Sequence, residues 1–370
     1  MSEIDELIEI SRHYGSDSAY VIAGGGNTSF KNDERIWIKA SGIPLAGISE
    51  GGFVCLSRQK LGEIEDKTYS EDSVLREEQV KSDMQNAIIS PKDLRPSVET
   101  SLHNLIDHAF IVHTHPTIIN AVMCANDAQK EVEKRFGSDA LYMEYTDPGY
   151  ILFKKLQEEI RSYRQRYGSE PKIIFLQNHG IFVGANSPSE VKDIYKAVVS
   201  RITEEKDLAL PSGRLETYQS ELTSLVSDYY ASRKLVAKAF RSPISNHFSL
   251  SHDQYQKISR PFTPDIIVYC KSNYLFLEKG TKPKETGDRL REFEKAMGYY
   301  PKVIVEEKGG LIILEESEKS IQTVLEVFTD MMKISLLSEQ FGGPHFMTDE
   351  QISFIDNWEV ENYRRKVAKK

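Results

Sequence analysis

Cysteine and long apolar runs are scarce in this chain of 370 residues. The 3 cysteines are Cys55, Cys124 and Cys270, and an odd number at wide spacing argues against a disulfide framework and against a cysteine-based zinc site. No apolar run approaches the length of about 20 residues that spans a bilayer. The polar, helix-like start over residues 1–20 is followed by no apolar signal-peptide core. These absences predict a protein of the reducing cytoplasm without a membrane partner.

Positive charge is also in short supply. Lysine and arginine number 47 against 56 acidic residues, which gives a formal net charge of −9. Nucleic-acid binders neutralise phosphates with basic side chains, so this balance argues against a nucleic-acid partner. A small phosphorylated substrate needs only a local positive pocket and stays compatible with it. No low-complexity tract or fixed-period repeat stands out, which argues against disorder and solenoids.

Several motifs of common enzymes are missing. The glycine-rich stretch at Gly24–Gly26 has neither the G-x-G-x-x-G spacing of a dinucleotide site nor the Gly-Lys-Ser/Thr of a Walker loop. We therefore expect no nucleotide cofactor. No Gly-x-Ser-x-Gly elbow occurs, so a hydrolase triad is unsupported.

The first half of the chain mixes expected strands and helices around one sheet. Helices are expected over 1–20, 100–108, 117–126 and 187–206, and strands over 35–40, 52–57, 109–112, 172–176 and 180–184. Between them, residues 58–95 are polar and charged and carry no assignment.

The second half is expected to form a helix and linker followed by a smaller α+β unit. Helices are expected over 215–240, 318–340 and 348–367, a linker over 241–264, and strands over 266–270, 274–277, 303–305 and 311–314. The predicted domains are 1–212 for the catalytic part, 213–264 for the helix and linker, and 265–370 for a C-terminal domain of unknown role.

The strongest local feature is His113-Thr114-His115. On an extended segment, residues two apart point the same way, so the two imidazoles can bind one transition metal. A polar strand end is the alternative interpretation, because such short motifs arise by chance. His179 changes the balance, since it follows a buried strand and adds a third imidazole. Three protein ligands with an open position are typical of a catalytic zinc site.

Glu99 lies in Pro96–Thr100, at an expected loop-to-helix transition just before the His-x-His strand. A carboxylate beside a metal can be a further ligand or a general base. Judged by itself, Glu99 is better explained as an acid favoured by the positive end of a helix.

A phosphate could lie against the turn Gly24–Ser29, whose backbone N–H groups can face an anion, or against Ala40-Ser41-Gly42. Lys31 and Lys39 could add positive charge. A plain turn is the alternative interpretation. The remaining histidines have no metal spacing to one another and are expected at the surface or as satisfied interior residues: His13, His103, His108, His247, His252 and His345.

Taken in order, these pieces resemble the class II aldolase/adducin family. The matching segments are GGGNTSFK at 24–31, WIKASG at 37–42, PSVETSLH at 96–103, IVHTHP at 111–116, EYTDPGY at 144–150 and IIFLQNHGIFVGA at 173–185. The resemblance covers about residues 5–206. It implies an α/β/α domain around a central mixed sheet, commonly assembled as a homotetramer.

The resemblance also implies roles for individual residues. His113, His115 and His179 match the family's zinc ligands, and Glu99 matches its acid/base glutamate. The positions that match the phosphate site of the family are Asn27, Ser41, Gly42 and Ser97. Many members have two serines before the glutamate, whereas the second position here is Val98. One phosphate donor is therefore missing from the pattern.

The spacing from Glu99 to His113, together with a weaker match over the C-terminal half, resembles the aldolase portion of bifunctional rhamnulose-1-phosphate aldolase/alcohol dehydrogenase proteins. In those proteins a dehydrogenase domain follows, whereas this sequence stops at Lys370. No dehydrogenase activity is therefore expected.

The implied function is zinc-dependent cleavage of a ketose 1-phosphate to dihydroxyacetone phosphate and an aldehyde. Two alternatives come from the same family, a pentulose-5-phosphate 4-epimerase and a thio-sugar-phosphate dehydratase. A third is a non-catalytic, adducin-like interaction module, which is expected to lack the metal ligands.

Overall fold

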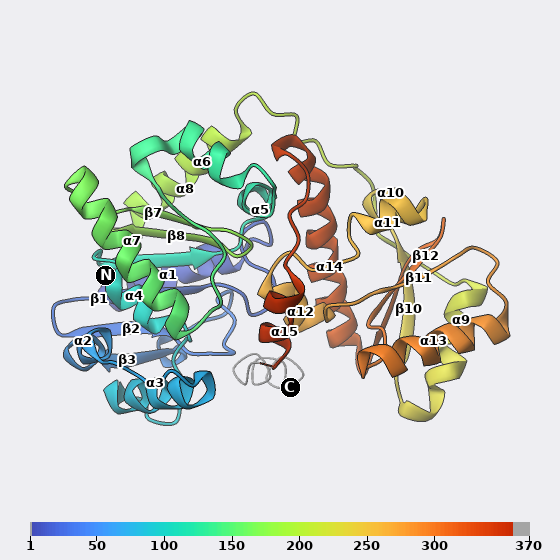
Figure 1. Ribbon diagram of the computed structural model, residues 1–370, viewed down its shortest axis with the longest axis horizontal. Coiled ribbons are helices and arrows are strands. Elements are labelled where there is room, and N and C mark those ends of the chain that lie inside the picture. Colours follow the sequence, from blue (N-terminus) through green and yellow to red (C-terminus); the bar gives the residue numbers. More distant parts are fainter. Residues whose placement is uncertain (1, 358–370) are drawn as a thin grey trace. The chain divides into compact units, whose positions relative to one another are not determined.

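The computed structural model describes residues 2–357, and contacts divide the chain into two compact units (Figure 1). The first unit runs to Met123 and resumes over Asp127–Lys206. The second comprises Cys124–Asn126 and the chain from Asp207 onward. Within the described residues, no helix has the length and apolar character needed to cross a membrane.

The first unit is built on an eight-stranded sheet of order β4-β3-β2-β1-β5-β8-β7-β6. Neighbouring strands are antiparallel except β6 and β7, which are parallel, so the sheet is mixed. The strands are β1 Asn27–Lys31, β2 Arg35–Lys39, β3 Phe53–Ser57, β4 Ile88–Ser90, β5 Phe110–Thr114, β6 Leu141–Met143, β7 Ile173–Leu176 and β8 Gly180–Ala185.

Helices cover both faces of this sheet. On one face lie α2 Arg58–Asp66, α3 Ser73–Ala87, α4 Thr100–Leu105 and α7 Tyr150–Tyr167. On the other lie α1 Glu3–Gly15, α5 Thr117–Met123 and α8 Pro188–Thr203, while α6 Ala128–Phe136 follows α5. The unit is therefore the three-layer α/β/α domain with a central mixed sheet that the sequence predicts.

The middle strands β5 and β8 are buried along their whole length. Their apolar and β-branched side chains suit strands covered by helices on both faces. The pairing register places His113 opposite Phe182 and Thr114 opposite Ile181. The end of β5 and the start of β8 therefore lie side by side, and the site is built at this edge of the sheet.

The second unit holds a five-stranded sheet of order β11-β12-β13-β10-β9. Its strands are β9 Glu216–Tyr218, β10 Val236–Arg241, β11 Leu275–Leu277, β12 Val303–Glu306 and β13 Gly310–Glu315. Side chains from α9 Glu221–Tyr230 and α13 Pro283–Met297 pack with the sheet in one core cluster. The other helices are α10 Pro243–Ser249, α11 His252–Gln256, α12 Pro264–Cys270, α14 Glu318–Ser338 and α15 Asp349–Asn357.

Three sequence predictions in this unit are wrong. The helix expected over 215–240 is divided into β9, α9 and β10, and the linker expected over 241–264 contains α10 and α11. The strand expected over 266–270 is part of α12. Its buried apolar run fits either a strand or a helix by periodicity. Thr263 decides the outcome, because its side chain caps the helix start just before Pro264 at the first helical position.

Most other predicted elements are confirmed with boundaries shifted by a few residues. Residues 58–95, left unassigned from the sequence, contain α2, α3 and β4. The helix expected over 348–367 is present as α15, and residues 358–367 lie outside the described part of the chain.

Candidate metal centre

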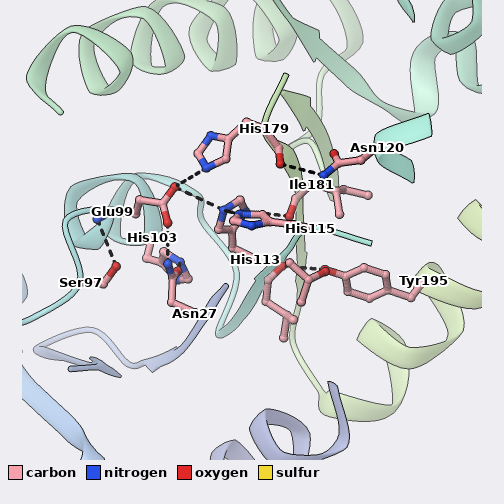
Figure 2. Close-up of polar contacts among 12 residues, drawn as sticks. Asn27, Ser97, Glu99, His103, His113, His115, Asn120, His179, Ile181 and Tyr195 are labelled. Carbon is pink, nitrogen blue, oxygen red and sulfur yellow. Dashed lines mark hydrogen bonds and ion pairs between the residues drawn. The ribbon is translucent and has the colours of Figure 1, made fainter. Parts of the chain in front are cut away.

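Three imidazoles converge where β5 ends and β8 begins (Figure 2). His113 is the fourth residue of β5, His115 follows the strand, and His179 precedes β8. One potential ligand atom from each lies within 4.8 Å of the others, and the Nε2 atoms of His113 and His115 are 2.9 Å apart. The structure thus brings together the three histidines that the sequence predicts as ligands. Their metal role stays a prediction.

Backbone contacts fix the orientation of His113. Its Nδ1 lies 2.9 Å from the carbonyl oxygen of Ile181, which can only accept a hydrogen bond. Nδ1 therefore carries the proton, and the lone pair of Nε2 faces the other histidines. A hydrogen bond from the far ring nitrogen to a carbonyl is the usual way a metal-binding imidazole is held.

A tight turn holds His179 in place. Asn178 adopts a left-handed conformation with φ of 53°, and its N–H donates to the carbonyl of Met123 at the end of α5. Asn120, also on α5, donates its amide to the carbonyl of His179 over 3.3 Å. A side chain at Gly180 would meet the Thr114 carbonyl at 2.5 Å, so only glycine permits this approach of the two strands.

Glu99 completes the cluster from the first residue before α4. Its Oε1 lies 3.4 Å from Nε2 of His113 and 3.5 Å from Nε2 of His179 (Figure 2). This oxygen is buried and makes no hydrogen bond. A buried carboxylate oxygen without a donor is costly unless a cation or a protonated partner faces it.

A hydrogen-bonded chain leads away from the other oxygen of Glu99. Asn27 donates from Nδ2 to Oε2 of Glu99 over 2.5 Å, so its Oδ1 must be the end that pairs with Nε2 of His103. An amide oxygen only accepts, which makes His103 Nε2 the protonated nitrogen. Nδ1 of His103 then accepts from the Ser29 hydroxyl over 2.7 Å. Each of these three hydrogen bonds has one donor and one acceptor when His103 is neutral.

The surroundings favour that neutral form. His103 is fully buried, and burial lowers its pKa well below the ordinary value, helped by the positive charges possible at His113 and Lys31. The sequence analysis expects His103 at the surface or as a satisfied interior residue, and it misses the link of His103 to Glu99. The signal is present, because His103 lies one helical turn after Glu99.

The donor set fits a divalent transition metal. Three imidazole nitrogens and a nearby carboxylate suit zinc and its neighbours, and the hydrogen-bond-free oxygen of Glu99 faces the same point. His113 is fully buried whereas the side chain of His179 is 17% exposed. His115 is also only partly buried, so a ligand would reach the cluster from the side of His115 and His179.

Three of the predicted phosphate residues, Ser41, Gly42 and Ser97, lie on adjoining loops, whereas Asn27, expected within a turn, is the first residue of strand β1. Ala40 and Pro96 form an isolated bridge, and the N–H of Ser41 donates to the carbonyl of Arg95. The loop of Ser41 and Gly42 therefore runs beside the loop of Ser97, two residues before Glu99. Asn27 is nearby through its bond to Glu99, although both ends of its amide are already engaged. The phosphate role of these four residues stays a prediction.

Lys31 and Lys39 differ in their position relative to the candidate phosphate turns. Lys39 is buried and donates to the carbonyls of Ile43 and Gly24, so its charge lies between the two candidate phosphate turns. Lys31 lies at the other end of β1 and donates to the carbonyls of His103 and Ile106. Burial lowers the pKa of Lys31 to about 7. Lys31 therefore supports α4 and does not serve the turns.

The family described as Class II Aldolase and Adducin N-terminal domain matches residues 5–201. The chain belongs to this family. Class II aldolases are typically metal-dependent, and family members act on phosphorylated sugars and often form oligomers.

Individual relatives are more distant. Residues of this chain are 28% identical over 187 positions to a Bacillus subtilis (strain 168) protein named Uncharacterized oxidoreductase YuxG. The match covers 48% of this chain and 26% of that protein, so the chain spans about a quarter of its length.

Two solved structures match about half of this chain but most of their own length. An N-terminal class II aldolase domain from Thermoplasma acidophilum is 25% identical, with a TM-score of 0.46, over 54% of this chain and 92% of that chain. An L-fuculose 1-phosphate aldolase is 18% identical, with a TM-score of 0.36, over 55% of this chain and 84% of that chain.

Proposed function

We propose that this chain is a divalent-metal-dependent class II aldolase that cleaves a ketose 1-phosphate to dihydroxyacetone phosphate and an aldehyde. Zinc is the metal that the donor set favours, and a rhamnulose- or fuculose-1-phosphate-like sugar is the proposed substrate. The observation that carries the proposal is the convergence of three imidazole nitrogens, with Oε1 of Glu99, which makes no hydrogen bond, beside two of them. An adducin-like module without catalysis has no need of such a cluster.

In the proposed mechanism, the metal ion and the side chains of the protein have separate roles. His113, His115 and His179 would hold the metal, which supplies Lewis-acid polarisation of the substrate carbonyl. Glu99 would move a proton between substrate and site, since its carboxylate is the ionisable group beside the three imidazoles. Asn27 orients this carboxylate through Oε2 and leaves Oε1 to face the reacting group. Lys39 and the adjoining turns at Ser41 and Ser97 would hold the phosphate of the substrate.

The test combines a metal assay with a substrate screen. We expect about one zinc or similar ion per chain, loss of that ion in the folded His115→Ala variant, and aldehyde release from at least one ketose 1-phosphate. Metal retained in full by His115→Ala would contradict the assigned site. Interconversion of pentulose 5-phosphates without aldehyde release would replace the aldolase by an epimerase.

Glu99→Gln separates proton transfer from metal binding. The amide keeps the size of the side chain and removes the base, so kcat should fall by about 10²–10⁴-fold, the usual contribution of a general acid–base group. Metal content should change little, because the imidazoles remain. Turnover at the wild-type rate in this variant would assign the base to another residue.

A further inference from the structure

The two sheets of the chain share one strand order when each is followed from its parallel edge. The second unit runs β11-β12-β13-β10-β9, and the first runs β6-β7-β8-β5-β1 before adding β2, β3 and β4. In both, the edge pair is parallel and every later pair is antiparallel. Equal order and direction over five strands define the same topology.

The connecting helices also correspond. α7 is capped at its C-terminus by Gly168 and leads into β7, and α13 is capped by Gly298 and leads into β12. Both glycines have a left-handed backbone conformation. α8 follows β8 with Ser187 as its cap, and α14 follows β13 with Ser317 as its cap. A helix of seven residues follows the equivalent strand in both units: α5 follows β5, and α10 follows β10.

Individual hydrogen bonds around β7 and β8 recur around β12 and β13. The residues that donate them are separated in sequence by the same number of positions as Gly180 and Gly310. The N–H of Gly184 donates to Lys172, and the N–H of Leu314 donates to Lys302. Asn178 has φ of 53° and Lys308 has φ of 56°. Each of these two left-handed residues donates its N–H to the last carbonyl of the corresponding short helix, at Met123 and Ser249 respectively.

Close contacts and residue identities follow the same correspondence. A side chain at Gly180 would meet the carbonyl of Thr114, and one at Gly310 would meet the carbonyl of Phe240, in each case at 2.5 Å. Corresponding positions that are identical in sequence include Pro171 and Pro301, Lys172 and Lys302, Ile174 and Ile304, Gly180 and Gly310, Ser187 and Ser317, Ile118 and Ile244, and Asn120 and Asn246.

We propose that the second unit is a diverged duplicate of the catalytic module and that its metal site has been lost. His113 pairs with Phe182 across β5 and β8, and its counterpart Ala239 pairs with Ile312 across β10 and β13. The same register sets Arg241 in the place of His115 and Gly309 in the place of His179. One chain thus carries a catalytic module and a non-catalytic copy of it.

Other side chains occupy the equivalent place in the second unit. Tyr218 pairs with Ala239 as Asn27 pairs with His113. Its hydroxyl donates to Glu306 over 2.7 Å, and the guanidinium of Arg241 lies 4.4 Å from the centre of its ring. These contacts replace an imidazole cluster by a cation–aromatic pair. Among the described residues, only the His113, His115 and His179 group could hold a metal.

Restoring the ligands tests the correspondence. The variant A239H/R241H/G309H carries histidines at the three equivalent positions, and E306L is added because a side chain at Gly309 would meet Glu306 at 2.6 Å. Leu176 is the counterpart of Glu306 in the first unit. The matched control V236H/R241H/K308H carries the same number of new histidines on differing faces of the strand. Zinc per chain is measured after dialysis.

We expect the ligand-restored variant to hold about one zinc ion more than the wild-type chain, and the control to hold none more. A folded restored variant without the additional ion would overturn the correspondence. If it does not fold, H113A/H115A/H179A gives the second measurement. Loss of all bound metal there supports a metal-free second unit, and retained metal overturns it. The readout is an increment in metal, so it is independent of whether the chain is an aldolase.

Discussion

The side-chain amide of Asn27 has two ends, and their assignment decides how the carboxylate of Glu99 is held. Because the NH₂ end faces Glu99, the oxygen end must face His103, which fixes that imidazole as the Nε2–H tautomer. Loss of such an outer partner typically costs about 10–100-fold in metal affinity or activity. We therefore propose that His103 is a positioning residue that acts through Asn27.

Replacing His103 should expose this role. His103→Phe keeps a ring but removes the donor to Asn27, so kcat should fall about 10–100-fold with KM changing less. His103→Gln retains an N–H donor and should recover part of the lost rate. His108→Phe, which changes a buried histidine outside the chain of hydrogen bonds, serves as the control. Equal kcat in the Phe and Gln variants of His103 would contradict the role.

Lys31 gives a pH-dependent prediction. Its pKa is about 7 in the folded protein and near the ordinary value of 10.5 in the unfolded chain. Between these values the unfolded chain binds a proton that the folded protein lacks, so the free energy of unfolding should rise with pH across that window. Denaturant titrations from pH 7 to 10 measure the slope. Lys31→Met should flatten it, whereas Lys60→Met, at an exposed position, should not.

At the scale of elements, the contact between β5 and β8 sets the geometry of the site. A methyl group at Gly180 would meet the Thr114 carbonyl at 2.5 Å and the His115 ring at 2.7 Å. Gly180→Ala should therefore destabilise the first unit by about 1–3 kcal/mol, as overpacking does, and weaken metal binding through His115. Gly62→Ala is the control, because that position is open. Unchanged metal affinity in Gly180→Ala would show that His115 is not a ligand.

The same elements show how much the sequence could predict. His113 and His115 could be placed on one side of a strand by alternation, and His179 was added because it follows a buried strand. The sequence shows that His103 lies one helical turn after Glu99, but the hydrogen bonds of His103 to Ser29 and Asn27 could not be predicted, since they join residues 74 and 76 positions apart. In the second unit, α12 shows that a short buried apolar run does not distinguish strand from helix.

The duplication was equally hidden from sequence reasoning. The identical positions are sparse and separated, and no fixed-period repeat stands out from composition or motif. What persists is the set of positions that backbone geometry constrains, such as Gly180 and Gly310 at a close strand contact. The ligands themselves changed to Ala239, Arg241 and Gly309, so the feature that draws attention in the first unit is absent from the second.

At the scale of the whole molecule, the two units should respond differently to metal. A ligand that binds only the folded state stabilises it by about 2.7 kcal/mol at 100 times its Kd. Zinc should therefore raise the melting temperature of the first unit and leave that of the second unchanged. Scanning calorimetry with and without a chelator measures both transitions. A metal shift in His115→Ala equal to that of the wild-type chain would contradict the assigned site.

The location of the ligands also bears on the order of folding. His113 and His115 come from one segment and His179 from another, and these meet only after β5 has paired with β8 across the intervening α5, α6, β6, α7 and β7. Pairing strands so distant in sequence is slow, because the entropy of closing a long loop is lost before any contact forms. A zinc ion therefore has no complete site to bind on the nascent or early collapsed chain. On the proposed assignment of the ligands, metal binding follows the pairing of β5 with β8 and does not nucleate the sheet.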